Sequence, residues 1–265
     1  MDLGLADARV VVTGGASNIG RGIVHAFAAE GARIVINDID GPQAEKVQAE
    51  AMKLGAGEAN AVLADLTVAG GAEAAVGAAQ DAWGGLDVLV NNAGWSVPGF
   101  IATDTDRDKW QRTIEINLFS AIAATQAAIP AMKEAGGGAI VFIASDAAFG
   151  QIRQGVYGAS KAAMVALAPT TAREHGRHGI RSNVVCPGLV IPEGPDAVGA
   201  HSLWAVGQDA VFNEKQIDFM LKDTPLRRLT TADDIGRAVL WFSSPLAARQ
   251  VTGQLISVSG GYTMP

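Results

Sequence analysis

Residues 9–20 read RVVVTGGASNIG, a run of β-branched residues followed at once by a glycine-rich turn. The run Arg9–Thr13 predicts a strand, since β-branched side chains fit a buried pleated surface. The residues from 18 to 30 predict a helix that ends at Gly31, because glycine is common just past a helix C-terminus. A strand that passes through glycines directly into a helix is typical of a parallel β-α-β unit. This stretch therefore predicts an α/β fold.

The same alternation of short apolar strands and longer alanine-rich helices continues along the chain. Further strands are expected at Arg33–Ile36, Ala59–Leu63, Leu86–Val90, Ala139–Ile143, Arg181–Val185 and Gln254–Val258. Helices are expected near 42–54, 71–82, 108–134, 157–177 and 232–243. Continuous apolar strands between helices indicate a parallel sheet covered on both faces. We therefore predict one domain over residues 1–265, a doubly wound parallel sheet of the Rossmann type with helices on both faces.

Residues 189–225 interrupt this pattern with prolines, glycines and several large apolar side chains. The segment is longer than an ordinary connection, and long insertions are usually binding loops or lids. It leaves the carboxyl end of a strand, where ligands bind in such sheets. We expect a lid over the ligand; the alternative is a surface excursion that packs on a neighbouring subunit.

Composition and charge exclude several classes of protein. The chain has 265 residues, 49% of them hydrophobic, and 20 basic against 27 acidic residues, for a net charge of −7. That balance lacks the basic footprint of a nucleic-acid binder. The single cysteine, Cys186, cannot form an intrachain disulfide, which favours a reducing, cytoplasmic location. The start of the chain has no basic n-region, and no run of about 18 apolar residues exists, so neither a signal peptide nor a membrane segment is expected.

The glycine-rich turn is suited to a dinucleotide. Glycine lets the backbone approach a pyrophosphate, and the following helix N-terminus offers unpaired N–H groups. Such a turn alone is a weak signal. Asp38, 18 residues past Gly20 at the end of the second expected strand, strengthens it because its carboxylate can accept hydrogen bonds from ribose hydroxyls. The alternative for Asp38 is a plain capping role before Pro42.

The same carboxylate favours NAD over NADP. A 2′-phosphate about 4 Å from Asp38 is repelled by about 4 kcal/mol at an effective dielectric near 20. The neighbours Asn37, Ile39 and Asp40 carry no positive charge, and neither do Ser17 and Asn18. NAD is therefore the expected cofactor.

Tyr157 and Lys161 are spaced to act together at the start of an expected helix. Residues four apart share a helix face. Moving a hydride to or from a carbinol carbon requires an acid/base for the hydroxyl proton, and a free tyrosine, with a pKa near 10, needs a shift of about three units to work near neutral pH. A lysine ammonium about 4 Å away supplies about 4 kcal/mol, which matches that shift. We therefore expect Lys161 to lower the pKa of Tyr157.

Two further polar residues are candidates for the same site. Ser145 follows the apolar run 139–144, so it lies at the carboxyl end of a strand, where its hydroxyl can polarise a substrate oxygen. Asn117 is a lone amide in an apolar helix, and a buried amide needs partners; one useful partner is a water that leads to Lys161. Taken singly, either residue is more often structural.

Together these motifs resemble the short-chain dehydrogenase/reductase family over essentially the whole chain. The resemblance implies a catalytic tetrad of Asn117, Ser145, Tyr157 and Lys161. It implies adenine contacts at Asp65 and Leu66, a cofactor-lining motif at Asn91–Gly94, and a backbone contact to the carboxamide from Val190, just after Pro187 and Gly188. The full set of expected cofactor-binding residues is Gly14, Ser17, Asn18, Ile19, Gly20, Asp38, Asp65, Leu66, Asn92, Ala93, Gly94, Tyr157, Lys161, Pro187, Gly188 and Val190. The resemblance also implies a homotetramer.

The chain departs from the family pattern at a few positions. Asn18 replaces the middle glycine of the turn, and asparagine tolerates left-handed backbone angles better than most residues. Pro192 stands where the family often has a threonine that contacts the cofactor. Ser259 replaces a frequent acidic residue before the final Gly–Gly pair. These changes leave every expected catalytic group in place.

The substrate is expected to be a small molecule, bulky and mainly apolar. Trp95, Arg153, Gln154 and Trp204 are the residues expected to shape its pocket, with Ser96, Phe212, Phe219 and Met220 as neighbours. Arg153 either meets an anionic tail or is solvated, and His201 is expected to be solvated because Tyr157 fills the acid/base role. The remaining histidines form no metal-like cluster with Cys186, so no metal is expected.

We therefore predict an NAD-dependent oxidoreductase that transfers a hydride between NAD(H) and a secondary alcohol or ketone. One alternative is a β-ketoacyl thioester reductase or hydroxyacyl-CoA dehydrogenase, which shares the chemistry and differs in partner. Another is a non-catalytic NAD-binding scaffold or redox sensor, against which the complete tetrad argues. A methyltransferase also uses a glycine turn and an acidic strand end, but it does not explain the Tyr–Lys pair.

Overall fold

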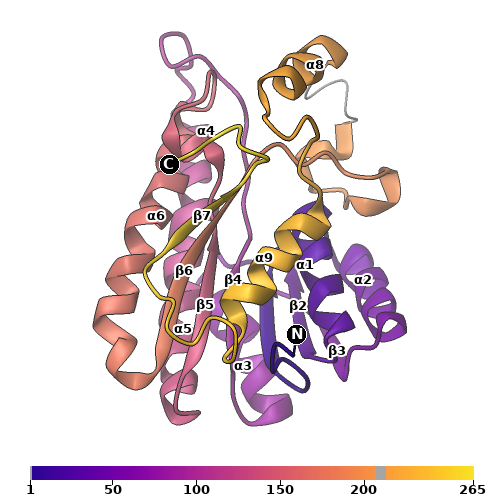
Figure 1. Cartoon of the computed structure of the whole chain (residues 1–265), viewed down its shortest axis with the longest axis vertical. Helices are drawn as coiled ribbons and strands as arrows, with labels where there is room; N and C mark the ends of the chain where they lie inside the picture. The colour runs from indigo at the N-terminus through magenta and orange to yellow at the C-terminus, as the bar shows by residue number, and fades with distance from the viewer. Residues whose placement is uncertain (1, 207–212) are drawn as a thin grey trace.

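The computed structural model describes residues 2–206 and 213–265. Seven strands form one parallel sheet in the order β3-β2-β1-β4-β5-β6-β7 (Figure 1). They are β1 (Arg9–Thr13), β2 (Arg33–Asp38), β3 (Glu58–Leu63), β4 (Val88–Asn91), β5 (Gly138–Ile143), β6 (Ile180–Pro187) and β7 (Leu255–Val258). The strand order reverses between β1 and β4, which is the point where such sheets open a crevice for a ligand. The predicted fold class is thereby confirmed.

Helices cover both faces of the sheet (Figure 1). They are α1 (Asn18–Ala29), α2 (Gly41–Leu54), α3 (Gly71–Trp83), α4 (Arg107–Ile114), α5 (Ser120–Glu134), α6 (Gly155–His175), α8 (Glu214–Asp223) and α9 (Ala232–Ser243). One apolar core lies between the sheet and α1, α2 and α9, and includes Phe27, Val47 and Val239. The other lies between the sheet and α3, α5 and α6, and includes Ala75 and Met164. Two buried cores explain why the strands are apolar on both sides.

The α1–α9 pair shows how closely the first core is packed. Gly22 of α1 faces Ala232 of α9, and a Cβ atom added at Gly22 would lie only 2.5 Å from the Ala232 Cβ. Gly236 makes the reciprocal approach from α9, where an added Cβ would lie 2.9 Å from the Ala26 Cβ. Small residues at the crossing therefore let the two helix backbones pack closely.

The helix expected over 108–134 is interrupted at the centre. Residues Glu115–Phe119 form a π-helical turn between α4 and α5, and Asn117 lies within it with no exposed surface. Such single π turns are often found at functional sites.

The whole helical run Arg107–Glu134 is long and apolar enough to pass a test for a membrane span, with 39% of the tested window buried inside the structure. Its α5 part packs in the second core, and core helices pass the same test, so a membrane partner gains little support.

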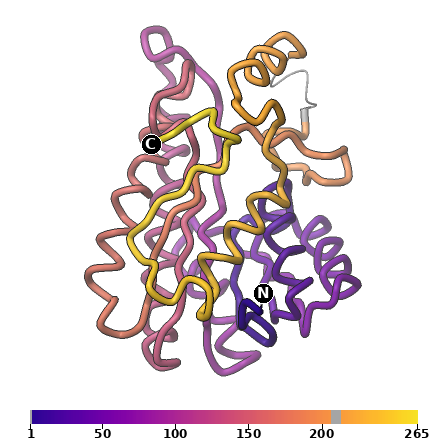
Figure 2. Tube along the Cα trace, in the orientation of Figure 1, coloured from indigo at the N-terminus to yellow at the C-terminus, as the bar shows by residue number. Residues whose placement is uncertain are grey.

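The expected insertion contains structure that the sequence did not predict. Within 189–225 the chain forms short 3₁₀ turns at Pro195–Ala197 and Leu203–Val206 and then helix α8. Asn213 caps α8 with a reciprocal side-chain and backbone capping box. Phe212 lies outside the described residues. In Figure 2 this orange part of the trace stands beyond the carboxyl edge of the sheet, on the side of α1 and α2.

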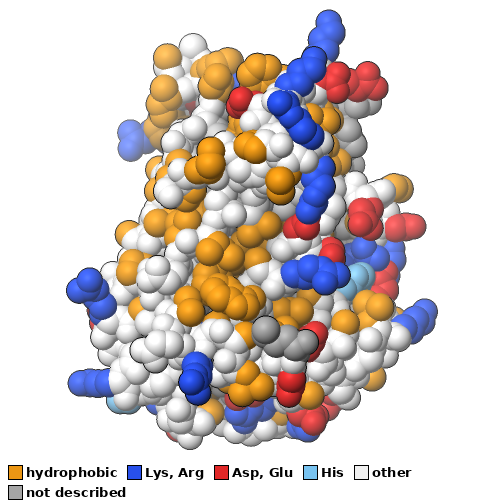
Figure 3. Space-filling model, in the orientation of Figure 1, with side chains coloured by type: hydrophobic (Ala, Val, Ile, Leu, Met, Phe, Trp, Pro, Cys, Tyr) orange, Lys and Arg blue, Asp and Glu red, His pale blue; other side chains and the backbone are white. Residues whose placement is uncertain are grey.

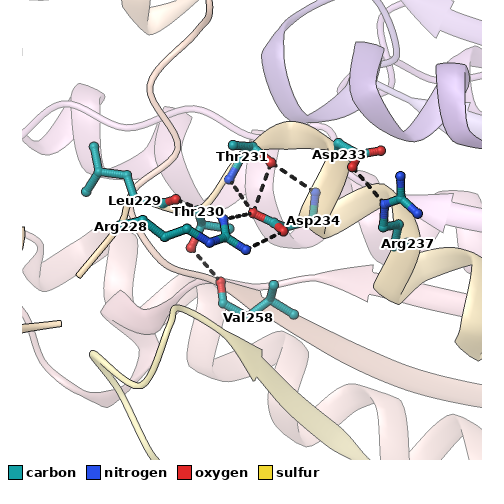
Figure 4. A network of polar contacts seen from close by, with 8 residues as sticks. All are labelled: Arg228, Leu229, Thr230, Thr231, Asp233, Asp234, Arg237 and Val258. Carbon is teal, nitrogen blue, oxygen red and sulfur yellow. Dashed lines mark hydrogen bonds and ion pairs between the residues drawn. The ribbon is translucent and has the colours of Figure 1, made fainter. Parts of the chain in front are cut away.

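A polar network anchors the chain where it returns from α8 to α9 (Figure 4). Thr231 caps α9 through Asp234, and Arg228 holds the same carboxylate with two hydrogen bonds of 2.6 and 2.8 Å. Thr230 donates from its hydroxyl to the Val258 carbonyl of β7 at 3.0 Å. The guanidinium of Arg228 and the capping contacts keep the pKa of Asp234 well below its usual range. The carboxyl-terminal end of the insertion is therefore fixed to the sheet.

Candidate active site

A cavity of about 650 Å³ opens at the carboxyl edge of the sheet. Its lining gathers the ends of β1, β2, β3, β4 and β5 with the start of α6 and part of the insertion. Of the expected site residues it contains Gly14, Ser17, Asn18, Ile19, Gly20, Asp38, Asp65, Leu66, Asn92, Ala93, Gly94, Trp95, Tyr157, Lys161 and Trp204. Residues far apart in the sequence thus meet in one place.

The glycine turn adopts the backbone shape that its residues predict. Gly14 has a φ of 60° and Asn18 a φ of 42°, both in the left-handed region. Asparagine at position 18 therefore takes the angle that the family usually assigns to glycine. Gly20 has no space for a side chain, because an added Cβ would lie 1.9 Å from the Gly14 carbonyl oxygen. The turn is closed on itself and brings the start of α1 to the cavity.

The N-terminus of α1 is suited to hold a phosphate. Ser17 is the N-cap residue, yet its side chain makes no capping hydrogen bond to the first turn of the helix. Instead its hydroxyl accepts a hydrogen bond from the Gly199 amide at 2.8 Å. The first-turn amides therefore keep their positive end toward the cavity, which is the arrangement that binds anions. The donor set fits the pyrophosphate of a dinucleotide.

Asp38 lies at the end of β2 and is held by backbone amides. Its Oδ2 accepts from the Ala16 amide at 3.0 Å, and its Oδ1 accepts from the amides of Ile39 and Asp40 at 2.8 and 3.1 Å. These bonds fix the carboxylate, and Oδ2 retains a lone pair for a further donor. Its place in the cavity fits a contact with ribose hydroxyls.

The end of β4 joins the glycine turn to the rest of the site. The Asn92 side chain donates to the carbonyls of Thr13 and Gly14 at 2.9 and 2.8 Å. Gly94 lies beside the catalytic candidates, since a Cβ there would be 3.2 Å from Lys161 Nζ and 3.3 Å from Asn117 Oδ1. The Asn91–Gly94 motif therefore connects the cofactor side of the cavity with the Tyr157 side.

Tyr157 and Lys161 lie one turn apart on α6, as their spacing predicts. Lys161 is buried, its Nζ donates to the Ile143 carbonyl at 2.8 Å, and it lies 5.8 Å from the centre of the Tyr157 ring. The Tyr157 side chain is hydrogen-bonded to Ser145 at the end of β5. Tyr157 and Lys161 line the cavity; Ser145 lies next to Tyr157 but, like Asn117, is not part of the lining.

The pKa of Tyr157 differs from the expectation. Burial raises the pKa of the phenol, and the hydrogen bond to Ser145 lowers it only in part. The Lys161 ammonium lies 5.8 Å from the centre of the Tyr157 ring and donates to the Ile143 carbonyl. Burial also lowers the pKa of Lys161 to about 8. Burial therefore raises the pKa of Tyr157 in the protein without ligand, and the expected lowering by Lys161 stays a prediction for the occupied site.

Asn117 uses its side chain to brace the loop after β4. Its Oδ1 accepts from the Trp95 amide at 2.7 Å, and its Nδ2 donates to the Trp95 carbonyl at 3.0 Å and to the Ser160 hydroxyl at 2.9 Å. Both amide hydrogens are therefore occupied by protein groups. The expected role of Asn117 in ordering a water near Lys161 stays a prediction.

Two buried titratable groups lie behind Ser145. Asp146 is 1% exposed; its Oδ1 accepts from the Ser257 hydroxyl at 3.1 Å, and its Oδ2 has no hydrogen-bond partner in the described structure. Burial raises the pKa of Asp146 to about 6. The Cys186 thiol is also buried, and burial raises its pKa to about 12. Neither group lines the cavity.

The expected substrate residues divide into two groups. Trp95 and Trp204 line the cavity, and the Arg112 guanidinium lies over the Trp95 ring at 5.2 Å from its centre. Arg153 and Gln154 instead line a small separate pocket behind the loop after β4. The Arg153 guanidinium lies 5.6 Å from the centre of the Phe100 ring, and Gln154 accepts from the Ser96 hydroxyl at 2.9 Å. The cation in the cavity wall at this end is therefore Arg112, which sequence reasoning missed.

The residues after β6 lie beside the cavity. Pro187 ends β6, and the Gly188 amide donates to the Val258 carbonyl at 3.0 Å. The Val190 carbonyl accepts from the Asn18 side chain at 3.1 Å, which ties the start of the insertion to the glycine turn. None of these three residues lines the cavity, so their expected cofactor contacts stay predictions.

Comparison with known proteins agrees with this geometry. A family model described as enoyl-(acyl carrier protein) reductase matches residues 14–263. The chain is 35% identical to 7α-hydroxysteroid dehydrogenase of Escherichia coli K12 over 252 residues, 95% of this chain and 92% of that protein. The chain belongs to the short-chain dehydrogenase/reductase family.

One further relative and one solved structure are also similar to this dehydrogenase. It is 34% identical over 258 residues to D-β-hydroxybutyrate dehydrogenase of Cupriavidus necator, covering 95% of this chain and 96% of that one. A solved structure of 7α-hydroxysteroid dehydrogenase complexed with NADH and 7-oxo glycochenodeoxycholic acid superposes with a TM-score of 0.88 at 34% identity, covering 98% and 96% of the two chains. The dehydrogenase is thus an oxidoreductase of secondary alcohols with a nicotinamide cofactor. These relatives favour that activity over the thioester and scaffold alternatives.

The positions of the side chains give each residue of the dehydrogenase a chemical task. Tyr157 is the group placed to take the hydroxyl proton of an alcohol and to return it to a ketone. Ser145, bonded to Tyr157, does not line the cavity, and its expected hydrogen bond to the substrate oxygen stays a prediction. Lys161 brings a positive charge to the cofactor side of Tyr157. A bound nicotinamide would supply the hydride acceptor or donor, and its positive charge when oxidised would oppose the rise in the Tyr157 pKa that burial causes.

Several cavity residues were not expected from the sequence. They are Asn37, Ile39, Asp40, Ala64, Thr67, Arg112, Glu115, Ile116, Ser120, Ile143, Ala144, Ser202 and Leu203. Ile143 and Ala144 end β5 just before Ser145, so their place at the carboxyl edge could have indicated them. Arg112 and Ile116 are one helical turn apart, and Ile116 directly precedes Asn117, a spacing that carries no signal until the helix has been placed.

Proposed function

We propose that this dehydrogenase uses NAD(H) in preference to NADP(H) to interconvert a bulky, mainly apolar secondary alcohol and its ketone. The observation that carries the cofactor choice is the carboxylate of Asp38, which lies in the cavity with Asp40 close behind it. The cations in the cavity wall, Lys161 and Arg112, come from α6 and α4 instead of the end of β2. A 2′-phosphate at Asp38 therefore meets negative charge without a neighbouring cation.

The proposed substrate class is supported by the large apolar side chains that line the cavity. Trp95 and Trp204 present indole rings to the cavity, and Leu203 adds an aliphatic side chain. The relatives named above act on a hydroxysteroid and on hydroxybutyrate, so the family fold accepts both large and small alcohols. The two indoles support the larger class for this chain.

The proposal extends to a homotetramer. Its support is exposed apolar surface at two places: Trp241 on α9 is 39% exposed, and Phe119 at the end of the π-helical turn before α5 is 50% exposed. Figure 3 shows hydrophobic side chains gathered over α9 and the adjoining part of β7. Light scattering on the purified protein tests this assembly, and a monomeric mass contradicts it. A cytoplasmic location stays a prediction from the single cysteine.

The test of the proposed activity is an absorbance assay for reduced nicotinamide over hydroxysteroids, other secondary alcohols and hydroxyacyl thioesters, each with NAD and NADP. We expect turnover of a bulky secondary alcohol, with kcat/KM larger for NAD. Equal or better efficiency with NADP contradicts the cofactor proposal. Exclusive activity on hydroxyacyl thioesters contradicts the substrate proposal.

A further inference from the structure

The first part of the insertion is fastened to the nucleotide half of the cavity. We call residues 190–204 the strap. Its backbone is bonded to the glycine turn and to the start of α2: Val190 O accepts from Asn18 Nδ2, Asp196 O from Gln43 Nε2 and Lys46 Nζ, Gly199 N donates to Ser17 Oγ, and Ala200 N donates to Asp40 Oδ2. The next residues of the strap, 201–204, line the cavity. The position of this cavity wall therefore depends on these attachments.

The two carboxylate oxygens of Asp40 accept hydrogen bonds from two different parts of the chain. Its Oδ1 accepts from the Gln43 amide at 3.2 Å, which caps α2, and its Oδ2 accepts from the Ala200 amide at 2.7 Å. The bond to Ala200 joins residues 160 positions apart and has the length of a charge-assisted hydrogen bond. The contact of Lys46 with Asp196, by comparison, lies on the surface, where the Asp196 side chain is 95% exposed. Surface pairs of that kind contribute little.

Gly199 fits closely against the same carboxylate. A Cβ atom at position 199 would lie 2.4 Å from Asp40 Oδ2 and 3.2 Å from Ser17 Oγ. Gly199 is buried, while Ala200 is exposed. The strap thus approaches Asp40 and Ser17 more closely than any residue with a side chain allows. This close packing indicates that the contact of the strap with Asp40 and Ser17 is specific.

We propose that Asp40 is a positioning residue: through Ala200 it holds the strap over the cofactor cavity and so limits how fast a nicotinamide cofactor leaves. The proposal rests on the proposed function, because it concerns the release of that cofactor. Asp40 Oδ2 is the acceptor, and a cofactor held beneath the strap can leave only when that bond and the Ser17–Gly199 bond open. Residues 201–204, the last part of the strap, then move away from the cavity together with residues 199 and 200. The attachment to Asp40 therefore links the cavity wall beside Trp204 to the nucleotide half of the cavity.

Asp40→Ser separates the two roles of this side chain. Serine is as good an N-cap as aspartate, so the variant keeps a cap for α2. Its hydroxyl is one bond shorter and cannot serve both Gln43 and Ala200. The matched control is Asp106→Ser, since Asp106 caps α4 through the Lys109 amide in the same way but has no contact with the strap in the described structure. Asp40→Asn is a second variant, which retains one oxygen for the cap should the serine variant fail to fold.

The first measurement needs no cofactor. Hydrogen exchange of a peptide covering 199–204 reports whether the strap is held. We expect exchange about tenfold faster in Asp40→Ser than in wild type, the value for losing one hydrogen bond to a charged acceptor at a partly exposed site. Asp106→Ser is expected to leave this peptide unchanged. Equal exchange in wild type and a folded Asp40→Ser overturns the proposal.

The second measurement is the rate of NADH release, followed by stopped-flow fluorescence. We expect a similar increase, about tenfold, in Asp40→Ser and a higher KM for NAD, because the bound cofactor is no longer covered. A purely structural role of Asp40 as a helix cap predicts no change in release when the cap is kept. An unchanged release rate therefore overturns the proposal as well.

Gly199→Ala provides an independent check through a double-mutant cycle. Alone it forces its Cβ against Asp40 Oδ2 and is expected to speed exchange and release. In the Asp40→Ser background that oxygen is gone, so the added effect of Gly199→Ala is expected to be small. Additive effects of the two changes contradict a direct contact. Wild-type protein that binds neither NADH nor NADPH contradicts the proposed function instead, and the exchange measurement still decides whether Asp40 holds the strap.

Discussion

Lys161 lies with its ammonium 5.8 Å from the centre of the Tyr157 ring while donating to the Ile143 carbonyl at 2.8 Å. The lysine is therefore held by the sheet and not by the phenol. Its charge lies between the end of β5 and the cavity that it lines. The acidity of the phenol then depends on the occupied site, because burial alone raises the Tyr157 pKa.

Replacing Tyr157 by phenylalanine removes the proton-transferring oxygen and little else. We expect kcat to fall by at least about a hundredfold, the usual contribution of a general acid/base. Binding of NADH, measured by fluorescence titration, is expected to change less than about threefold. Tyr262, the other tyrosine of the chain, lies near the C-terminus outside the cavity lining and offers the matched control Tyr262→Phe. A Tyr157→Phe enzyme with normal turnover refutes the assigned chemistry.

Asp38→Ser is expected to change the choice between NAD and NADP. Removing the carboxylate removes a repulsion of up to about 4 kcal/mol toward a 2′-phosphate, a value that solvent reduces. We expect the ratio of kcat/KM for NADP to that for NAD to rise by about ten- to a hundredfold. Asp65 also lines the cavity, at the end of β3, so Asp65→Ser is the control and is expected to leave the ratio unchanged. A ratio that is equally unchanged in Asp38→Ser contradicts the role given to Asp38.

Asp146 is expected to make stability depend on pH. Its pKa in the folded protein, about 6, is above the ordinary value of 3.8, so the folded state prefers the protonated acid. The associated stability is fully present below pH 3.8 and is lost as the pH rises through 6. Asp146→Asn, which stays neutral, is therefore expected to be more stable than wild type above pH 6 and no more stable near pH 4.

Urea unfolding at pH 4, 5 and 7.5 measures this difference. We expect the advantage of Asp146→Asn at pH 7.5 to be on the order of 1 kcal/mol, given the partial compensation by Ser257. Asp81→Asn on the exposed surface of α3 is the matched control, with a pH slope like that of wild type. A constant difference at all three pH values would show that Asp146 does not titrate in this range.

Two glycine-to-alanine changes test the packing of the first core. Gly22→Ala places a Cβ 2.5 Å from that of Ala232, so α1 and α9 must separate, and we expect a loss of about 1–3 kcal/mol in unfolding free energy. Gly77→Ala on α3 meets nothing within 4 Å and is expected to be neutral or to stabilise by up to about 1 kcal/mol. Thermal and urea unfolding of the pair compare the two helices directly. Similar effects of both changes contradict the close α1–α9 approach.

The strands and most helices could be predicted because each carries its own local signal. The run Val10–Val12 is apolar and β-branched on both faces, and it forms the central strand β1. The boundaries shifted where a partner elsewhere in the chain decides them. Leu86 was expected to begin β4, but the strand begins at Val88, since Asp87 is turned to the Arg9 guanidinium at 2.6 Å.

The features that could not be predicted depend on contacts between distant residues. The π turn at Asn117 coincides with side-chain bonds to Trp95 and Ser160, and nothing in the local residues Glu115–Phe119 marks an irregular helix. Asp40 looks like a plain helix cap until the fold brings Ala200 to its second oxygen. The catalytic candidates were found because their spacing along α6 and at strand ends is local. The segment that contains the strap was expected as a lid, but its attachments could not be predicted, because their partners are 150 or more residues away.

The thiol of Cys186, the single cysteine of the chain, can report whether the sheet is intact. It lies at the base of the catalytic groups with no exposed surface, and its pKa of about 12 keeps it in the unreactive protonated form at physiological pH. Alkylating reagents and peroxides can therefore reach it only in molecules whose sheet has opened between β5, β6 and β7. The fraction of labelled cysteine counts those molecules, so damage to the catalytic edge can be followed in a mixture without any substrate.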